Sequence, residues 1–371
     1  MSESLMRIER VTLRLLRMPL VRPFRTSFGV ETERQVLVAT VHTDRGTGWA
    51  ECAAEAVPLY LSEFNDAVVL VVEQHLVPRL KAAGPLTAAD AAVVLRPVKG
   101  HRMAKAMLEC ALLDAELRDA ELSFASRLGA ARSAVPVGVA VGITDTVERL
   151  VEHVAGYVAD GYRRVKLKIE PGFDVEPVRA VREAFPDLML QVDANTAYTI
   201  ADAGHLAALD AFDLLLIEQP LGDDDLVGHA ELAKRLDTPI CLDEAIRTID
   251  HCRSAIALGA TEVVNIKPAR VGGYLAAVQV HDLCVEHGIP AWCGGMLETG
   301  LGRAANLALA ALPGFTLPGD LSASARYWTR DITEPFSLNA DGTMDVPPGP
   351  GLGVTVDTEY VDELTVWRRD L

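Results

Sequence analysis

The chain has 371 residues, of which 50% are hydrophobic, and a formal net charge of −17. Its length suits a large domain plus a smaller one, and its composition is typical of a globular protein. The charge repels polyanions, and no apolar run approaches the ~18 residues of a membrane span, so we expect neither nucleic acid nor a membrane as a partner. The N-terminal residues lack a signal-peptide layout, which predicts a cytoplasmic protein whose six scattered cysteines are reduced core residues.

Residues 1–130 are predicted to form an α+β domain. Apolar and polar residues alternate over residues 5–54, which predicts an antiparallel meander with a turn at Asp44-Arg45-Gly46. Between its first two strands we expect a polar loop, VRPFRTSFGVE. Helical periodicity follows in residues 61–80, 86–95 and 101–117.

Residues 131–324 change to short apolar runs that alternate with helical segments. This alternation predicts βα units and a parallel sheet, and seven or eight such strands suit a closed barrel of the TIM type. From residue 325 to 371 the texture is mixed and polar, and we expect this segment to return to the first domain.

Polar residues recur along the predicted barrel at a constant interval. Their spacing is 25, 25, 25 and 24 residues through Lys168, Asp193, Glu218, Asp243 and Lys267. Each therefore lies at the C-terminal end of its strand, on the face where barrel enzymes carry their sites.

The three acidic residues predict a metal site. Asp193, Glu218 and Asp243 present only oxygen, which suits a hard divalent cation such as Mg²⁺ or Mn²⁺. Any one of them alone could instead cap the following helix. Three at a constant interval favour the metal, because buried carboxylates without a partner are unfavourable.

The stretch RRVKLKI predicts two inward lysines on one strand. A period of two sends Lys166 and Lys168 to one face and Val165 and Leu167 to the other. Lys267 ends a strand on the opposite side of the barrel. Positive neighbours and desolvation can lower a lysine pKa from about 10.4 to ~7–8, which would make Lys168 and Lys267 a pair of general bases beside a metal-stabilised enediolate.

A glycine-rich segment, WCGGMLETGLGRAAN, follows a later strand. Its residues Gly294, Gly295, Met296 and Leu297 either bind an anionic or amide oxygen of a substrate or merely turn the chain. The segment carries only part of a dinucleotide-binding fingerprint.

Together these segments resemble a known family. VKLKIE, QVDANTAY, LLLIEQP, CLDEA, VNIKPARVGG and WCGGMLETGLGRAAN occur in the order found in the muconate-lactonizing-enzyme subgroup of the enolase superfamily. HRMAKAMLECALLDAEL and LPGDLSAS resemble its N-acylamino acid racemase / o-succinylbenzoate synthase family. The resemblance implies a (β/α)₇β barrel under an α+β capping domain, one Mg²⁺ per active site (Mn²⁺ or Co²⁺ in vitro), a small carboxylate substrate and a homo-oligomer.

The resemblance also implies residue roles. Lys168 and Lys267 would be the acid/base pair, and Lys166 an electrostatic helper. Asn195 and Glu244 would orient ligands or lysines. A mobile lid and a second capping loop would bring Phe24, Arg25, Ser27, Leu59 and Tyr60 to the substrate.

Two features bear on the reaction. Ala140 stands where relatives often carry serine, and GDLSAS lacks a second acidic residue after Asp320, so an acylated amine fits better than a free ammonium. We expect a racemase of N-acylamino acids, with N-succinyl substrates favoured. The dehydration that yields o-succinylbenzoate stays open as a second or the main activity, and a Schiff-base aldolase and a non-catalytic barrel are the alternatives from other classes.

Overall fold

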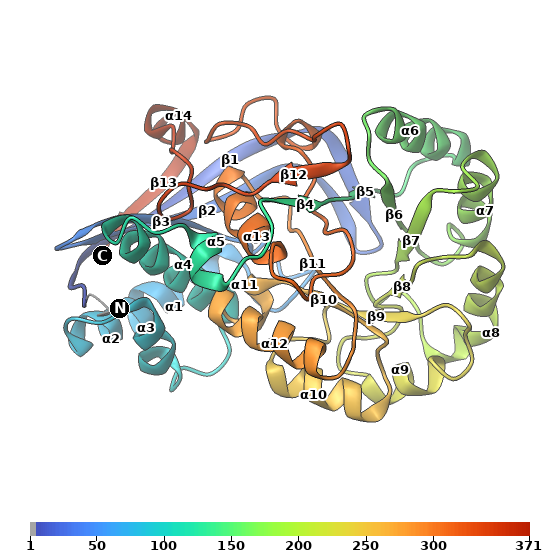
Figure 1. The fold of residues 1–371 in the computed structure, drawn as a ribbon, viewed down its shortest axis with the longest axis horizontal. Coiled ribbons are helices and arrows are strands. Elements are labelled where there is room, and N and C mark those ends of the chain that lie inside the picture. Colours follow the sequence, from blue (N-terminus) through green and yellow to red (C-terminus); the bar gives the residue numbers. More distant parts are fainter. Residues whose placement is uncertain (1–4) are drawn as a thin grey trace.

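The capping domain is built on a four-stranded antiparallel sheet. The structure, a computed structural model, describes residues 5–371. Its sheet has the order β13-β1-β2-β3 (Figure 1). The bounds are β1 Ile8–Thr26, β2 Gly29–Thr43, β3 Gly46–Cys52 and β13 Thr365–Asp370. The C-terminal strand thus pairs with the N-terminal one, and the expected turn at residues 44 and 45 is confirmed.

Helices cover one side of this sheet, in the three regions where helical periodicity predicted them. They are α1 Asn65–Val71, continued by a π-helical turn Val72–Leu76, α2 Val77–Ala83, α3 Ala88–Leu95 and α4 Arg102–Asp119. A further short helix, α5 Phe124–Leu128, lies outside the predicted regions. Helix α4 packs closely on β3 because Gly48 has no side chain: a Cβ there would lie 1.9 Å from the Ala111 carbonyl oxygen.

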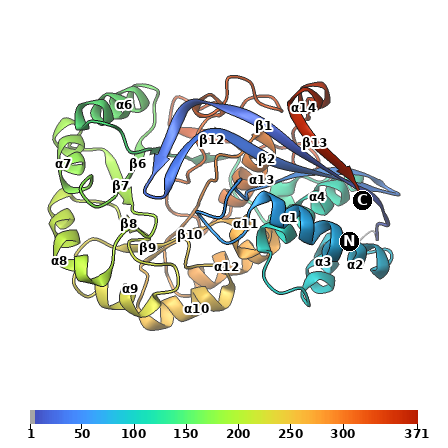
Figure 2. The ribbon, with the colours of Figure 1, turned by 180° about the vertical axis from the view of Figure 1, so that it is seen from behind.

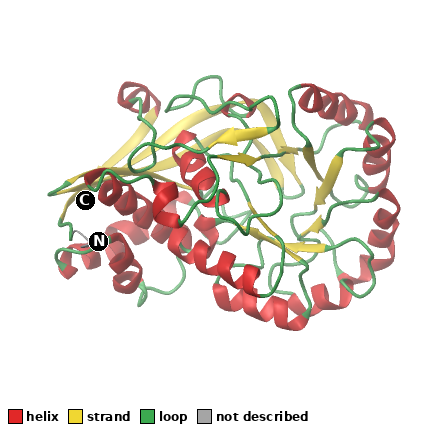
Figure 3. Cartoon of the chain, viewed as in Figure 1, coloured by secondary structure: helices red, strands yellow, loops and turns green. Residues whose placement is uncertain are grey.

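The second region is a parallel sheet enclosed by helices, as predicted. Seven strands follow the order β11-β10-β9-β8-β7-β6-β5, and the helices form an outer layer around them (Figure 3). The strands are β5 Val139–Val141, β6 Arg164–Lys168, β7 Met189–Asp193, β8 Ile217–Glu218, β9 Ile240–Leu242, β10 Val263–Ile266 and β11 Ala291–Cys293. The helices are α6 Val147–Ala159, α7 Val175–Ala184, α8 Ala203–Leu206, α9 Leu226–Leu232, α10 Ile249–Leu258, α11 Pro268–Val271, α12 Tyr274–Glu286 and α13 Gly300–Ala310.

An irregular segment, residues 315–320, connects the two edges of this sheet. Asp320 N–H donates to the Cys293 carbonyl at 3.0 Å, and Gly138 N–H donates to the Gly319 carbonyl at 2.8 Å. The segment therefore takes the place of an eighth strand between β11 and β5, which agrees with the expected (β/α)₇β barrel. The remaining elements are β4 Ala134–Pro136, paired with β12 Thr343–Asp345, and α14 Thr358–Leu364.

The expected loop over residues 21–31 is mostly strand. β1 continues to Thr26, and only Ser27 and Phe28 turn the chain, with an irregularity in pairing between Pro19 and Phe24. Pro23 lies within that irregularity, and residues 24–26 beyond it pair with β2 again. The hairpin reaches over the barrel (Figure 2), where Ile143 N–H donates to the Arg25 carbonyl at 2.9 Å.

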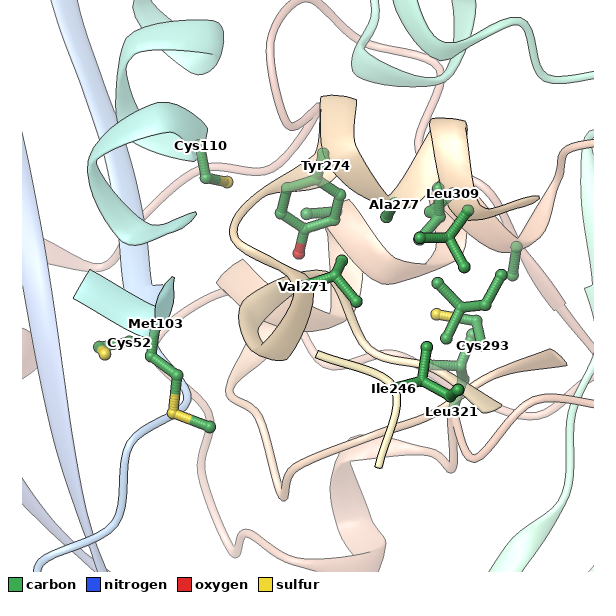
Figure 4. Close-up of a cluster of buried hydrophobic side chains, with 14 of the residues drawn as sticks. Cys52, Met103, Cys110, Ile246, Val271, Tyr274, Ala277, Cys293, Leu309 and Leu321 are labelled. Carbon is green, nitrogen blue, oxygen red and sulfur yellow. The ribbon is translucent and has the colours of Figure 1, made fainter. Parts of the chain in front are cut away.

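One apolar core runs through both regions. Cys52, Met103 and Cys110 of the capping domain lie in the same buried cluster as Val271 and Leu309 of the barrel (Figure 4). All six cysteines are buried and free, as expected. No helix within residues 5–371 combines the length and the apolar character needed to cross a bilayer.

Candidate active site

Strand register accounts for part of the constant interval of polar residues. Lys168 is the direct partner of Asp193 in the β6–β7 pair, and Asp193 is the partner of Glu218 in the β7–β8 pair. Asp243 follows the end of β9, and Lys267 follows the end of β10. Glu218 pairs with Cys241, so the row of direct partners stops before Asp243 and Lys267, and the five side chains share the C-terminal end of the strands without one common register.

Lys166 lies at the centre of a buried ionic cluster. Its ammonium lies 2.7 Å from Glu218 Oε2, 3.1 Å from Asp193 Oδ2 and 2.5 Å from Asp320 Oδ2. It also lies 4.8 Å from the centroid of the Trp292 ring. The lysine on this strand face therefore neutralises several carboxylates.

Lys168 is held by groups of the barrel alone. Its ammonium donates to Asp193 Oδ2 and to Asn195 Oδ1, each at 2.6 Å. Asn195 in turn donates to Glu244 Oε1 at 2.9 Å. Asn195 thereby fixes Lys168 with its oxygen and Glu244 with its nitrogen.

Lys267 is held by both domains. Its ammonium donates to Asp243 Oδ2 and to the Tyr60 hydroxyl, each at 2.9 Å. Arg270 also binds Asp243, and it donates to the Tyr60 hydroxyl at 3.1 Å. Tyr60 therefore connects the capping domain to this lysine.

The ionic contacts shift the pKa values of the cluster. Burial alone would raise the pKa of Asp193, but Lys168 and Lys166 outweigh it and lower that pKa to about 2. Burial alone would lower the pKa of Lys267, yet Tyr60 and the carboxylate of Glu244 raise it above its usual value. This differs from the expected lowering of the lysine pKa, because Tyr60, Glu244 and Glu218 together outweigh the effect of burial.

The three predicted metal ligands have the right chemistry but are engaged with lysines. Burial and the neighbouring Asp193 raise the pKa of Glu218, which shows that these two carboxylates compete for positive charge. Both oxygens of Asp243 contact Lys267 or Arg270. Within residues 5–371, no three acidic, His or Cys side chains converge closely enough to form a ready-made cation site. The oxygen-only donors and their need for positive charge fit a hard divalent ion.

A cavity of about 130 Å³ opens onto the lysines. Lys166, Lys168 and Lys267 line it together with Asn195 and Ala140. Five of the predicted substrate residues also line it: Phe24, Tyr60, Gly295, Met296 and Leu297. The exposed Leu59 does so as well.

The other three predicted substrate residues do not line this cavity. Arg25 faces a groove outside it and pairs with Glu170 at 2.8 Å. Ser27 donates to the Ala194 carbonyl at 3.0 Å, which anchors the hairpin tip to the barrel. Gly294 lies where a Cβ would be 2.2 Å from Asn265 Oδ1, so its role is a close approach of the backbone.

Sequence reasoning missed several polar groups of the site. Asn265 donates to Glu218 Oε1 at 2.7 Å, and it stands two residues before Lys267 on the same strand face, a spacing that could have identified it. Asp320 ends the last barrel segment and carried the same signal as the other acidic strand ends. Glu31 and Glu55 line the cavity from the capping domain, and no sequence interval points to them.

Comparisons with known proteins agree with this architecture. Residues 149–361 match the enolase C-terminal domain-like family, and residues 9–129 match the mandelate racemase / muconate lactonizing enzyme N-terminal domain. An N-succinylamino acid racemase from Amycolatopsis sp. is 59% identical over 98% of this chain and 99% of its own length. An o-succinylbenzoate synthase from Geobacillus kaustophilus is 46% identical over 98% of this chain and 97% of its own.

A solved structure shares the whole fold. It is a member of the enolase superfamily from Listeria innocua, with a TM-score of 0.94 at 38% identity over 99% of each chain. The resemblance seen in the sequence motifs is thus confirmed over nearly the full length. The chain belongs to the enolase superfamily of enzymes, within the group of mandelate racemase and muconate lactonizing enzyme.

Proposed function

We propose that this protein is a metal-dependent racemase of N-acylamino acids that works by two-base 1,1-proton transfer. The observation that carries the proposal is the pair Lys168 and Lys267, two buried lysines on β6 and after β10 that line one cavity. Relatives that bear the name N-succinylamino acid racemase support it. We place the enzyme in the cytoplasm and expect a homo-oligomer.

The lysines move the proton. One lysine, as the free amine, takes the α-proton from one face of the substrate, and the other, as the ammonium, returns a proton to the opposite face. Each nitrogen is positioned by two hydrogen bonds, Lys168 by Asp193 and Asn195, and Lys267 by Asp243 and Tyr60. Fixed positions on strand ends keep the reacting atoms in line.

The metal and Lys166 supply positive charge. Enzymes of this superfamily use a divalent metal ion, and Asp193, Glu218 and Asp243 would hold Mg²⁺ here. When bound, the ion favours negative charge on the substrate carboxylate, which makes the neighbouring α-proton more acidic. Lys166 adds an ammonium at the cavity wall, and the cavity keeps bulk water from the exchanging proton.

The experiment follows the α-proton of N-succinyl-L-phenylalanine by proton NMR in D₂O with Mg²⁺, together with optical rotation. We expect exchange with racemisation in the wild type. Racemisation should be lost in Lys168→Ala and in Lys267→Ala, and any remaining exchange should be confined to opposite enantiomers in the two variants. Lys234→Ala, at an exposed position, is the matched control. A wild type that exchanges no N-acylamino acid would rule out the racemase.

A second candidate is o-succinylbenzoate synthase. Relatives of that name are 46% and 45% identical to this chain, and the same lysines could serve a dehydration that begins with loss of an α-proton. Ultraviolet absorbance of the aromatic product distinguishes the two. A dehydration rate far above the racemisation rate would make the synthase the main activity.

A further inference from the structure

A large groove lies directly outside the catalytic cavity. Its volume is about 1320 Å³, and the hairpin of β1 and β2 separates it from the cavity, with Val30 lining both. Arginines line the groove on several sides: Arg22, Arg25, Arg149 and Arg326. In a chain with a net charge of −17, this gathering of arginines beside the site needs an explanation.

Arg326 lines the groove and contacts residues that line the cavity, which it does not line itself. Its Nη2 donates to the Ala140 carbonyl at 3.0 Å, and Ala140 lines the cavity next to its strand partner Lys166. The guanidinium lies 5.5 Å from the ring centroid of Phe24 and 5.0 Å from that of Tyr327, two rings that line the cavity. A third ring, Tyr157, lies 5.1 Å away. Aromatic rings around a guanidinium fix its plane and leave its edge free for a planar anion.

Two of the other three arginines of the groove have carboxylate partners, and the exposed Arg22 forms no ion pair within residues 5–371. Arg25 pairs with Glu170 at 2.8 Å, and Arg149 pairs with Asp145 at 3.6 Å. Among residues 5–371, no carboxylate forms an ion pair with Arg326, and its buried Nε has no hydrogen-bond partner. Without an ionic partner among these residues, the charge of the guanidinium is available to an external anion.

Two glutamates of the capping domain line the cavity. They are Glu31 and Glu55, which share the single guanidinium of Arg34 at 3.1 and 3.8 Å and leave Glu31 Oε2 without a partner. A second negative charge on a substrate is repelled from these glutamates and attracted to the side of Arg326.

We propose that Arg326 binds a carboxylate at the far end of the substrate's acyl group and so selects acyl chains that end in an acid over neutral ones. The inference rests on the proposed function and names a specificity-determining residue for it. Arginine suits this task because its fork can bind both oxygens of a carboxylate.

The test compares two substrates that differ only at the far end of the acyl group. N-succinyl-L-phenylalanine carries the carboxylate, and its terminal carboxamide analogue has nearly the same shape without the charge. In the wild type we expect kcat/KM to favour the acid by roughly 10- to 100-fold, mainly through KM. Arg326→Gln should remove that preference, and Arg326→Lys should keep part of it.

Arg330→Gln is the matched control. Arg330 also stacks on an aromatic ring, 3.9 Å from the centroid of Tyr360, and it lines neither the groove nor the cavity. It should retain the preference in full. Equal losses with both substrates in Arg326→Gln and Arg326→Lys would show a purely structural role and overturn the proposal.

The outcomes distinguish a failure of the proposed role of Arg326 from a failure of the proposed racemase activity. A wild type that racemises acid and amide equally well overturns the role of Arg326 and leaves the racemase intact. If the wild type exchanges neither compound, the proposed function fails, and calorimetric affinities for the same pair decide the carboxylate subsite. Equal affinities would overturn it, and tighter binding of the acid that is lost in Arg326→Gln would support it.

Discussion

Both regions of the molecule bury carboxylates, but they balance them differently. In the barrel, Asp193, Glu218 and Asp320 share the ammonium of Lys166. In the capping domain, Glu109 on α4 is 4% exposed, and its partner is the Tyr274 backbone N–H at 2.5 Å. Against the effect of burial, Lys168 and Lys166 lower the pKa of Asp193 to about 2, although burial raises that of the neighbouring Glu218. In the capping domain, burial raises the pKa of Glu109 to about 8 against the opposing effect of its backbone hydrogen bonds.

The difference shows what each region is built to do. The barrel keeps charges of both signs at the site where we propose that a substrate and a cation bind, and each sign offsets the other. The capping domain uses a carboxyl group to hold the start of α12, a task that a neutral acid performs as well. Removing a charged group should therefore destabilise the barrel, whereas in the capping domain it should remove a source of destabilisation at high pH.

The largest effect is expected from Lys166→Met. It leaves three buried carboxylates without their shared ammonium, which should cost about 3–5 kcal/mol of stability in EDTA and lower racemisation at least about 100-fold. Added Mg²⁺ should stabilise the variant more than the wild type, because a bound cation replaces part of the lost charge. Urea unfolding with and without Mg²⁺ measures both.

Lys234→Met, on the exposed surface, is the control for the lost lysine. A Lys166→Met protein as stable in EDTA as the wild type would mean that the barrel carboxylates do not depend on this ammonium, and the contrast between the regions would disappear.

A smaller effect on stability is expected from Glu109→Gln, which removes a buried ionisable group and should therefore make stability less sensitive to high pH. The folded pKa of Glu109, about 8, lies above the usual value of about 4.3 for an unfolded glutamate, so between these values the native state holds the extra proton. Wild-type stability should therefore fall as pH rises through this window. Relative to the variant, the wild type should lose about 2 kcal/mol between pH 6 and pH 8. Thermal unfolding at both pH values checks this, and parallel curves would contradict it.

The same contrast separates what the sequence could predict from what it could not. The barrel ends were predictable because parallel βα units repeat, so a constant interval places Lys168, Asp193, Glu218, Asp243 and Lys267 at the C-terminal ends of their strands. Period-two alternation likewise turned Lys166 inward. Whether these residues bind metal and substrate as proposed is left to the experiments above.

Contacts between the capping domain and the barrel could not be predicted from a repeating interval or an alternating pattern in the sequence. The hairpin over residues 21–31 looked like a loop because of Pro23 and Gly29, yet pairing with β2 and the contact of Arg25 with Ile143 satisfy its backbone as strand. Glu31, Glu55 and Arg326 reach the cavity or groove from segments whose spacing follows no barrel repeat. Their positions depend on how the capping domain packs, which local pattern does not encode.

Tyr60→Phe and Asn195→Ala compare the support that each region gives to one of the two lysines. It removes the hydroxyl that the capping domain supplies to Lys267, whereas Asn195→Ala removes the barrel's contribution to Lys168. Each should slow α-proton exchange roughly tenfold, the loss of one hydrogen bond to a charged group, but for opposite enantiomers. Exchange rates measured separately from each enantiomer test this, and an equal slowing of both enantiomers by Tyr60→Phe would contradict it.

The smallest effect is expected at the hairpin tip, where the neutral hydroxyl of Ser27 contacts backbone carbonyls of the barrel. Ser27→Ala removes the bond to the Ala194 carbonyl, next to Asn195, and should cost about 1 kcal/mol of local stability because no charge is involved. Faster hydrogen exchange of the hairpin amides, with kcat/KM lowered roughly two- to fivefold and global unfolding unchanged, would show that the capping domain is held over the site by weak contacts. Ser126→Ala, at an exposed position on α5, is the control. A loss of global stability would instead mean that the Ser27 contact helps to hold the whole fold together. The contrast between the charged contacts of the barrel and weak neutral contacts at the hairpin tip would then be wrong.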